Sequence, residues 1–430
     1  MLNALGLMKE RRFLPLFVTQ FFGAFNDNLF KQAMVVVAVY HIYHNPQAEQ
    51  SFTALATAIS IIPFFLLSAL AGQLADAHDK TRIIRIVKTA EIGIMLVGGG
   101  GLLLAKAGHT QIALVMMLTA VFALGVHSTF FGPIKYAILP QHLREDEVLG
   151  GTGLVESATY IAILTGTVLA GFMKVEHAVI GTLVVAAIGW FAARQVPSAP
   201  REGPPLKINY NPFTSSWRLV SATMHIPRLF LAICAISFFW TMGAVLIVIF
   251  TPLAKNVLTA DKHVATLLTA LFSIGIAVGS VAINSMLKGH TSAKYGPASV
   301  LAMGLCVILF SILCKTWPPA EPGHYYTWIE FIKMPRAALV VGALTGIAVF
   351  GGMFVVPLYA FLTTTVSKDQ TARTVAANNV VNSGAMAIGA LLVQGLSDWA
   401  RVTPANMLYV VAAMCPISAW LAWKLHRACD

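Results

Sequence analysis

Charged residues are scarce in this sequence. Only 11% of its 430 residues are Asp, Glu, Lys or Arg, whereas soluble domains carry roughly 25%. Acidic residues are the rarer kind, with 18 against 29 lysines and arginines, and 57% of the chain is hydrophobic. This composition excludes an ordinary soluble domain and indicates a polytopic membrane protein.

Several chemical motifs are also missing. The five cysteines lie in or beside apolar segments without Cys-x-x-Cys or Cys/His spacing, so neither a disulfide framework nor a metal site is expected. No Gly-rich phosphate-binding loop is present, and no cofactor is expected. The acyltransferase spacing His-x4-Asp fails because Asp146 follows His142 one position too early. We therefore expect no enzyme, and we attribute the net charge of +11 to membrane topology rather than to nucleic-acid binding.

Twelve apolar segments, each bounded by charged residues, proline or glycine, are long enough to cross a bilayer as helices. This pattern predicts an all-α membrane protein with twelve transmembrane helices in two six-helix, pseudo-symmetric halves. The approximate segments are 13–43, 51–77, 82–105, 110–139, 147–173, 176–195, 228–254, 263–287, 295–315, 335–364, 371–398 and 403–425.

Lysine and arginine set the expected orientation. If both termini lie on one side, nineteen of these residues fall in or beside the loops of that side and eight on the opposite side. This excess predicts cytoplasmic termini. The one long polar connection divides the chain into a six-helix bundle at 1–195, a cytoplasmic linker at 196–227 and a second bundle at 228–430. The end of the linker, residues 213–224, either lies flat on the membrane or is a plain connection.

A weak internal repeat supports two related halves. Tyr136-Ala-Ile-Leu139 is similar to Tyr359-Ala-Phe-Leu362, and a proline lies just upstream of each. Leu154-Val-Glu-Ser157 is similar to Val380-Val-Asn-Ser383. The second match makes a glutamate of the first half the counterpart of an asparagine in the second.

The first apolar segment carries polar residues in its middle. Asn26, Asp27 and Asn28 are followed one helical turn later by Lys31. A charge at this depth costs at least about 2.5–3.5 kcal/mol, which makes such residues candidates for a functional site. We expect all four to bind the polar part of a substrate. The alternative is that Asp27 and Lys31, four residues apart, neutralise each other on one helix face.

Two further charges lie at membrane depth, Lys135 in the fourth segment and Glu156 in the fifth. With Asp27 they could hold a zwitterion, because a carboxylate can take an ammonium group and a lysine can take a phosphate. Lys135 could instead extend to the cytoplasmic headgroups. Glu156 could instead form an ion pair with Lys135 that joins two helices.

The eleventh segment offers Asn378, Asn379 and Asn382 within little more than one turn. Amides at such positions either bind substrate or join helices by hydrogen bonds. His127 in the fourth segment is either a proton relay or a packing residue.

The loop after the second segment reads Gly72-Gln-Leu-Ala-Asp76-Ala-His-Asp-Lys80-Thr-Arg82. With the six-plus-six plan, it resembles the signature loop of the major facilitator superfamily, although Asp79 replaces the usual glycine. The resemblance implies a gate that involves Gly72, Asp76, Lys80 and Arg82. Asp76 is expected to cap a neighbouring helix or to pair with a cytoplasmic basic residue.

Three stretches resemble a narrower family, the bacterial lysophospholipid transporters of the LplT type, which occur alone or fused to acyltransferase and acyl-carrier-protein synthetase domains. The stretches are Phe22-Gly-Ala-Phe-Asn-Asp-Asn28, Pro133-Ile-Lys-Tyr-Ala-Ile-Leu139 and Gly153-Leu-Val-Glu-Ser-Ala-Thr-Tyr-Ile-Ala-Ile-Leu-Thr-Gly166. The resemblance implies that the chain moves lysophospholipid, chiefly lysophosphatidylethanolamine, to the cytoplasmic leaflet of the inner membrane by alternating access, for reacylation.

The same resemblance assigns headgroup contact to Asp27, Lys135 and Glu156. It implies contact with membrane lipids, a cytoplasmic acyltransferase or acyl-carrier-protein synthetase as partner, and a monomeric transporter. The second half departs from the family pattern, because residues 229–250 include no acidic or basic side chain that could bind a headgroup. That half offers an apolar and aromatic lining for an acyl chain instead: Phe238, Phe239, Trp240, Met353 and Phe354.

The main alternative is a proton-coupled transporter of a soluble organic solute. Asp27 or Glu156 would then bind and release the proton. A strong dependence of transport on the proton gradient would favour this alternative.

Overall fold

The structure is a computed structural model that describes residues 5–38, 42–43, 46–204, 206–321, 324–398 and 402–429. Over these ranges the chain forms twelve α-helices of 20 residues or more and a few short helices. The long helices are α2 (Leu14–Val37), α3 (Pro46–Ala77), α4 (Lys80–Lys106), α5 (Thr110–Ala137), α7 (Glu145–Phe172), α8 (Val175–Gln195), α10 (Pro227–Asn256), α11 (Lys262–Leu287), α12 (Gly296–Lys315), α14 (Ala337–Thr364), α15 (Thr371–Asp398) and α16 (Pro404–Cys429). The short ones are η1 (Leu7–Lys9), α6 (Leu139–His142), α9 (Pro212–Met224) and α13 (Trp328–Lys333).

Each predicted apolar segment corresponds to one long helix, which confirms the prediction of an all-α membrane protein. Within the described residues, eleven of the twelve are long and apolar enough to cross a membrane. The exception is α2, which has 24 residues and a polar centre around Asn26, Asp27 and Asn28. Its length still suffices for a bilayer of about 20 residues' span. The polar cluster is therefore what sets α2 apart.

Side-chain caps fix several helix starts. Asp79 accepts a hydrogen bond from the backbone N–H of Thr81 at 2.8 Å and so caps α4. Asp261 caps α11 in the same way, through the N–H groups of His263 and Val264. Such caps satisfy donors that have no partner inside the helix.

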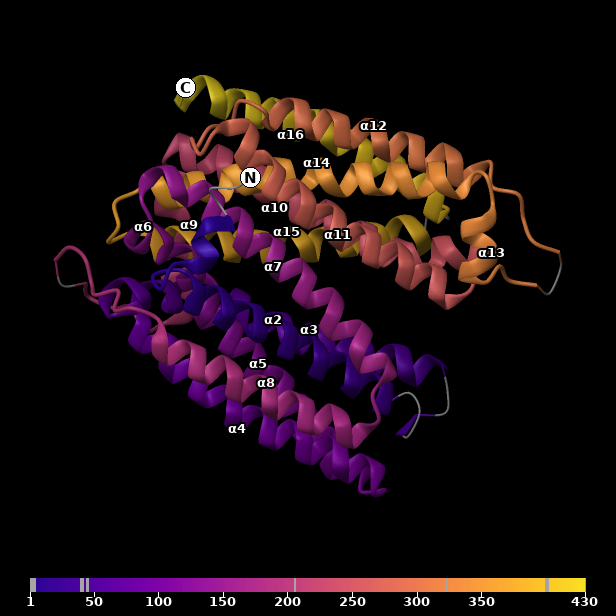
Figure 1. The fold of residues 1–430 in the computed structure, drawn as a ribbon, viewed down its shortest axis with the longest axis horizontal. Coiled ribbons are helices and arrows are strands. Elements are labelled where there is room, and N and C mark those ends of the chain that lie inside the picture. Colours follow the sequence, from indigo (N-terminus) through magenta and orange to yellow (C-terminus); the bar gives the residue numbers. More distant parts are fainter. Residues whose placement is uncertain are drawn as a thin grey trace. The chain divides into compact units, whose positions relative to one another are not determined.

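Two compact units make up the chain, and Figure 1 shows their helices. The N unit comprises Leu2–Thr223 and Leu362–Val380, and the C unit comprises Met224–Phe361 and Val381–Asp430. The N unit thus includes the first turns of α15, whereas the predicted boundaries assign these residues to the second half. Those boundaries stay a prediction.

Each unit is a helical bundle with an apolar interior. In the N unit, α2 packs against α7 and α8, α4 packs against α5 and α8, and α3 packs against α5. The buried side chains Phe30, Met95 and Met117 bring α2, α4 and α5 into one core. In the C unit, α10 packs against α11 and α16, and α12 packs against α16.

The predicted linker is attached to the N unit. The Gln73 side chain of α3 donates to the Ser215 hydroxyl of α9 at 2.5 Å and accepts from the backbone N–H of Asn209 at 2.9 Å. Asp79 accepts from the Ser198 hydroxyl at 2.7 Å. Asp79 therefore provides both a cap for α4 and a hydrogen bond to the linker.

Candidate functional site

Asp27 on α2 is half-buried and only partly satisfied. Its Oδ2 accepts a hydrogen bond from the Ser128 hydroxyl of α5 at 2.5 Å, and its Oδ1 is buried without a hydrogen-bond partner among the described residues. Lys31 is half-buried one turn later, and no ion pair joins these two described side chains. Asp27 and Lys31 therefore do not form the ion pair predicted as the alternative. One oxygen of the Asp27 carboxylate is buried without a counter-group among the described residues.

Asn26, the neighbour of Asp27, belongs to a different polar network. Its side chain is fully buried and donates to Glu91 on α4 at 2.8 Å. Glu91 forms an ion pair with Lys88, one turn earlier on the same helix. The Nε2 of His127 on α5 lies 3.1 Å from Glu91 Oε2. All four side chains are less than 9% exposed, so this network joins α2, α4 and α5 in the interior of the N unit.

Neither Lys88 nor Glu91 is predicted from the sequence as a site residue. Lys88 counts there among the basic residues that set the topology, but the structure buries it beside Glu91. Their spacing of three residues in an otherwise apolar segment is the signal that could have identified the pair. His127, predicted as either a proton relay or a packing residue, faces this pair.

A second candidate group lies where α5 and α7 meet. The Tyr136 hydroxyl is hydrogen-bonded to the carboxylate of Glu156, which is 1% exposed. The Lys135 ammonium lies 4.8 Å from the centre of the Tyr136 ring, a distance typical of a cation–π contact. No ion pair within 4.0 Å joins Lys135 to Glu156, although the structure describes both side chains. Tyr136 thus contacts both charged residues, a role that the sequence did not reveal.

The asparagine that follows Asp27 and the three asparagines of α15 have different surroundings. Asn28 donates to the backbone carbonyl of Ala24 in its own helix at 2.8 Å. Asn378 is fully buried, and neither polar atom of its side chain has a hydrogen-bond partner among the described residues. Asn379 is half-buried. Asn382 accepts a hydrogen bond at 2.7 Å from the Ser237 hydroxyl of α10, so this amide joins two helices of the C unit.

The signature loop forms a junction between α3 and the start of α15. Asp76 accepts hydrogen bonds from the backbone N–H groups of Ala372 and Arg373 and from Arg373 Nε, each at 3.0 Å. It therefore both caps α15 and pairs with a basic residue, whereas the sequence predicts these contacts as alternatives. A Cβ added to Gly72 would lie 2.6 Å from Ala376 Cβ, so only glycine permits this approach of the two helices.

The two basic residues of the predicted gate have unlike environments. Lys80 is fully buried, and its Nζ has no hydrogen-bond partner among the described residues. Opposite charges that reach it include those of Asp76 and Asp79. Arg82 is exposed.

Burial opposes ionisation of Asp79, but the hydrogen bonds from Ser198 and from backbone N–H groups outweigh it and hold the pKa of this carboxyl below its usual range.

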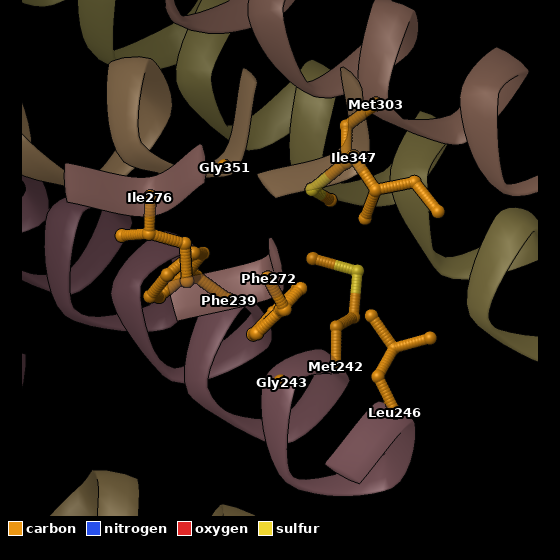
Figure 2. Close-up of a pocket in the computed structure, with 9 residues that line it drawn as sticks. All are labelled: Phe239, Met242, Gly243, Leu246, Phe272, Ile276, Met303, Ile347 and Gly351. Atoms are coloured by element: carbon orange, nitrogen blue, oxygen red, sulfur yellow. The ribbon is translucent and has the colours of Figure 1, made fainter. Parts of the chain in front are cut away.

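The C unit contains a small apolar cavity between α10, α11, α12 and α14 (Figure 2). Phe239 is the one predicted acyl-chain residue among those that line it. Met353 and Phe354 are buried elsewhere in α14, and Trp240 donates to the Tyr359 hydroxyl at 2.7 Å. The lining residues are Phe239, Met242, Gly243, Leu246, Phe272, Ile276, Met303, Ile347 and Gly351.

The described residues include no group of three or more His, Cys, Asp or Glu side chains that could hold a metal ion. The candidate binding groups of the N unit are polar, whereas the cavity of the C unit is apolar. The N unit presents carboxylate, ammonium and amide groups, some of them without partners, on membrane-spanning helices. The cavity of the C unit has no polar lining residue.

Known proteins with similar sequences are membrane transporters. A family model described as Major Facilitator Superfamily matches residues 16–390. The lysophospholipid transporter LplT of Cronobacter sakazakii is 26% identical over 385 residues, which cover 87% of this chain and 85% of that protein. The lysophospholipid transporter LplT of Photorhabdus laumondii subsp. laumondii is 27% identical over 355 residues, with 80% and 78% covered.

Solved structures share the fold at low sequence identity. The human organic anion transporter MFSD10 superposes with a TM-score of 0.77 at 11% identity, and the match covers 96% of this chain and 99% of that one. An outward-facing bacterial homologue of the iron transporter ferroportin gives a TM-score of 0.71 at 12% identity, with 96% and 98% covered. These likenesses concern the fold alone.

Proposed function

Because the chain belongs to the major facilitator superfamily, we propose that it is a lysophospholipid transporter that carries its substrate across a bacterial inner membrane by alternating access. The relatives in Cronobacter and Photorhabdus, both named lysophospholipid transporters, support this substrate class. We expect the cargo to be chiefly lysophosphatidylethanolamine, moved to the cytoplasmic leaflet.

The free oxygen of Asp27 is the observation on which the proposal rests. A half-buried carboxylate at the centre of α2 has one oxygen held by Ser128 and the other without a partner. Burying a polar group without a hydrogen bond is costly, so such a group in a membrane-spanning helix is typical of a binding site. An ammonium group of the substrate would supply the missing hydrogen bond and the opposite charge.

The phosphate of the same headgroup requires a cation. Lys31 and Lys135 are half-buried basic residues on α2 and α5, and neither forms an ion pair within 4.0 Å with any described residue. Glu156 and the unpartnered amide of Asn378 complete the polar set that we propose for the headgroup. Asn26 supports it indirectly, since this amide holds Glu91.

The acyl chain requires an apolar surface. The cavity beside Phe239 is smaller than the roughly 300–1,000 Å³ of a pocket that encloses a whole drug-sized ligand. We therefore assign it to the end of the acyl chain. The other predicted lining residues would contact the acyl chain only if α10 and α14 change their side-chain packing during transport. These residues are Phe238, Trp240, Met353 and Phe354.

Alternating access requires contacts that form in one state and break in another. We propose that the junction of Asp76 with Arg373 is such a contact, with Gly72, Lys80 and Arg82 around it.

Movement of a zwitterion needs no membrane potential because the net charge transferred is zero. We expect facilitated transport to the cytoplasmic leaflet, driven by reacylation of the lysolipid by a cytoplasmic acyltransferase or acyl-carrier-protein synthetase. We also expect the transporter to be a monomer with cytoplasmic termini.

Uptake of lysolipids into vesicles tests this function. Lysophosphatidylethanolamine, lysophosphatidylglycerol and lysophosphatidylcholine are compared, each with and without a proton gradient. Asp27→Asn should lower the uptake by about tenfold, because a hydrogen bond to a charged group is worth about 1.5–3 kcal/mol. Lys135→Ala and Glu156→Gln should also lower it. Asp146→Asn is the matched control, because Asp146 is 68% exposed at the start of α7.

The outcomes separate the candidate functions. If all three variants fold and transport lysolipid at the wild-type rate, the polar-site assignment is wrong. If the wild-type protein transports no lysolipid but accumulates a soluble solute when a proton gradient is applied, the proton-coupled alternative replaces the proposal.

A further inference from the structure

Helix α9 of the linker has two opposite faces. Ser215 and Thr223 are buried, at 2% and 6% exposure. Phe213 and Trp217 are four residues apart, which places them on one face of the helix, and they are 68% and 78% exposed. The apolar face of this helix is therefore turned away from the N unit rather than packed on it.

This exposure belongs to a well-formed helix. Asn211 Oδ1 accepts hydrogen bonds from the backbone N–H groups of Phe213 and Thr214, at 3.0 and 3.1 Å, and so caps the first turn. On the buried face, Ser215 accepts from Gln73 at 2.5 Å. The orientation of α9 is thus fixed by a side chain of α3.

The position of Gln73 tells where α9 lies with respect to a bilayer. Gln73 belongs to the last turns of α3, whose membrane-spanning part ends at Ala77. A helix that is hydrogen-bonded there lies at the boundary between hydrocarbon and water. Aromatic side chains are enriched at this boundary, where a ring can enter the headgroup region.

The charge of this stretch is one-sided. Residues 203–224 include Lys207 and Arg218, both exposed, and no aspartate or glutamate. Tyr210, 70% exposed, adds a third aromatic ring next to the helix. A short helix with an exposed aromatic face and flanking cations fits the surface of a membrane that contains anionic lipids.

We propose that α9 is a membrane-surface helix that binds anionic lipid headgroups. Phe213 and Trp217 insert among the headgroups, and Lys207 and Arg218 attract the anionic phosphates. Gln73 is a positioning residue, since it holds the opposite face of α9 against α3. The inference concerns the surface of the N unit and does not depend on which substrate the protein carries.

Quenching of tryptophan fluorescence by brominated lipid tests the proposal. The full chain is reconstituted into vesicles of brominated phosphatidylcholine, with and without phosphatidylglycerol. The spectrum of Trp217→Phe is subtracted from that of the wild-type protein to isolate the emission of Trp217. Trp328→Phe is the matched control, because Trp328 is 49% exposed on α13 and no basic residue of the linker lies near it in sequence.

We expect brominated lipid to quench Trp217, more strongly when phosphatidylglycerol is present and less at high salt. Lys207→Gln and Arg218→Gln should each raise the phosphatidylglycerol fraction needed for half-maximal quenching by about fivefold. Gln73→Leu should reduce the quenching of Trp217 and leave that of Trp328 unchanged. Trp217 emission that brominated lipid does not quench, or quenching that is indifferent to phosphatidylglycerol, would overturn the proposal.

Discussion

Asp76 on α3 accepts three hydrogen bonds from the first turn of α15, and one of them comes from the side chain of Arg373. The carboxylate is 1% exposed, whereas the arginine side chain is 23% exposed. An anion at a helix N-terminus is stabilised by the backbone N–H groups as well as by its partner cation. One buried carboxylate therefore fixes where the start of α15 lies on the N unit.

Removal of the charge at Asp76 should weaken this junction. Asp76→Asn keeps the shape of the side chain but loses a charge-assisted acceptor, so we expect a loss of stability of about 1.5–3 kcal/mol. The measurement is the thermal unfolding of the purified protein in detergent. Lys368→Gln is the control, because Lys368 is exposed in the loop that precedes α15. A variant Asp76→Asn as stable as the wild type would show that the junction contributes little.

Gly72 allows a second test of the same junction without any change of charge. Gly72→Ala places a Cβ 2.6 Å from Ala376 Cβ and 3.0 Å from the carbonyl oxygen of Ala372, so the helices must separate and the stability should fall. Gly93→Ala is the matched control on α4, because a Cβ there has no neighbour within 4 Å. This control should be neutral or more stable by up to about 1 kcal/mol, since alanine favours a helix more than glycine does. Equal effects of the two changes would contradict the close approach.

The sequence predicts the long helices well, since each needs only a sustained apolar run. It also identifies Asp76 as a residue that caps a helix or pairs with a basic residue, but it does not name Arg373 or α15 as the partner. Side-chain pairing between helices is harder to predict. Nothing in the chain indicates that Glu91 faces His127, because the two residues lie on different helices.

The orientation of residues within α14 could not be predicted for a related reason. This helix is apolar on all sides, with a mean hydropathy of 2.3, so its pattern does not distinguish a cavity face from a core face. Met353 and Phe354 consequently lie outside the cavity, which Ile347 and Gly351 line instead. Only packing against α11 and α12 decides which face turns to the cavity.

The buried pair of Lys88 and Glu91 should be sensitive to the loss of either partner. Glu91→Gln leaves the Lys88 ammonium buried without its counter-charge, and we expect a loss of about 3–5 kcal/mol of stability. The double variant Lys88→Met with Glu91→Gln removes both charges and should lose less than Glu91→Gln alone. Thermal unfolding of the single and double variants gives the coupling energy. Additive losses would show that the two charges do not depend on each other.

The lowered pKa of Asp79 predicts a pH dependence of stability. A carboxyl whose pKa is lower in the folded protein than its ordinary value of 3.8 stabilises the fold above that value, and the stabilisation disappears as the pH falls through the folded pKa. We therefore expect the wild type to exceed Asp79→Asn in stability by about 0.3–1 kcal/mol at neutral pH. The difference should shrink as the pH falls below 3.8 and disappear once the pH is below the folded pKa. A constant difference from pH 7 to pH 2 would mean that the charge of Asp79 is not involved.

Gly243 offers a direct test of the cavity in the C unit. A Cβ at this position has no neighbour within 4 Å, so Gly243→Ala should place a methyl group at the cavity without a clash and leave thermal stability intact. If the cavity takes the end of an acyl chain, each CH₂ excluded costs about 0.8 kcal/mol, so uptake of a lysolipid that loses one such contact should fall by about fourfold. Shorter chains should be transported at nearly the wild-type rate.

Gly342→Ala on α14 is the control, because that glycine is exposed and also has no neighbour within 4 Å. Equal losses for all chain lengths would exclude the cavity as the acyl-chain site, whereas a wild-type protein inactive on every lysolipid would count against the proposed function itself.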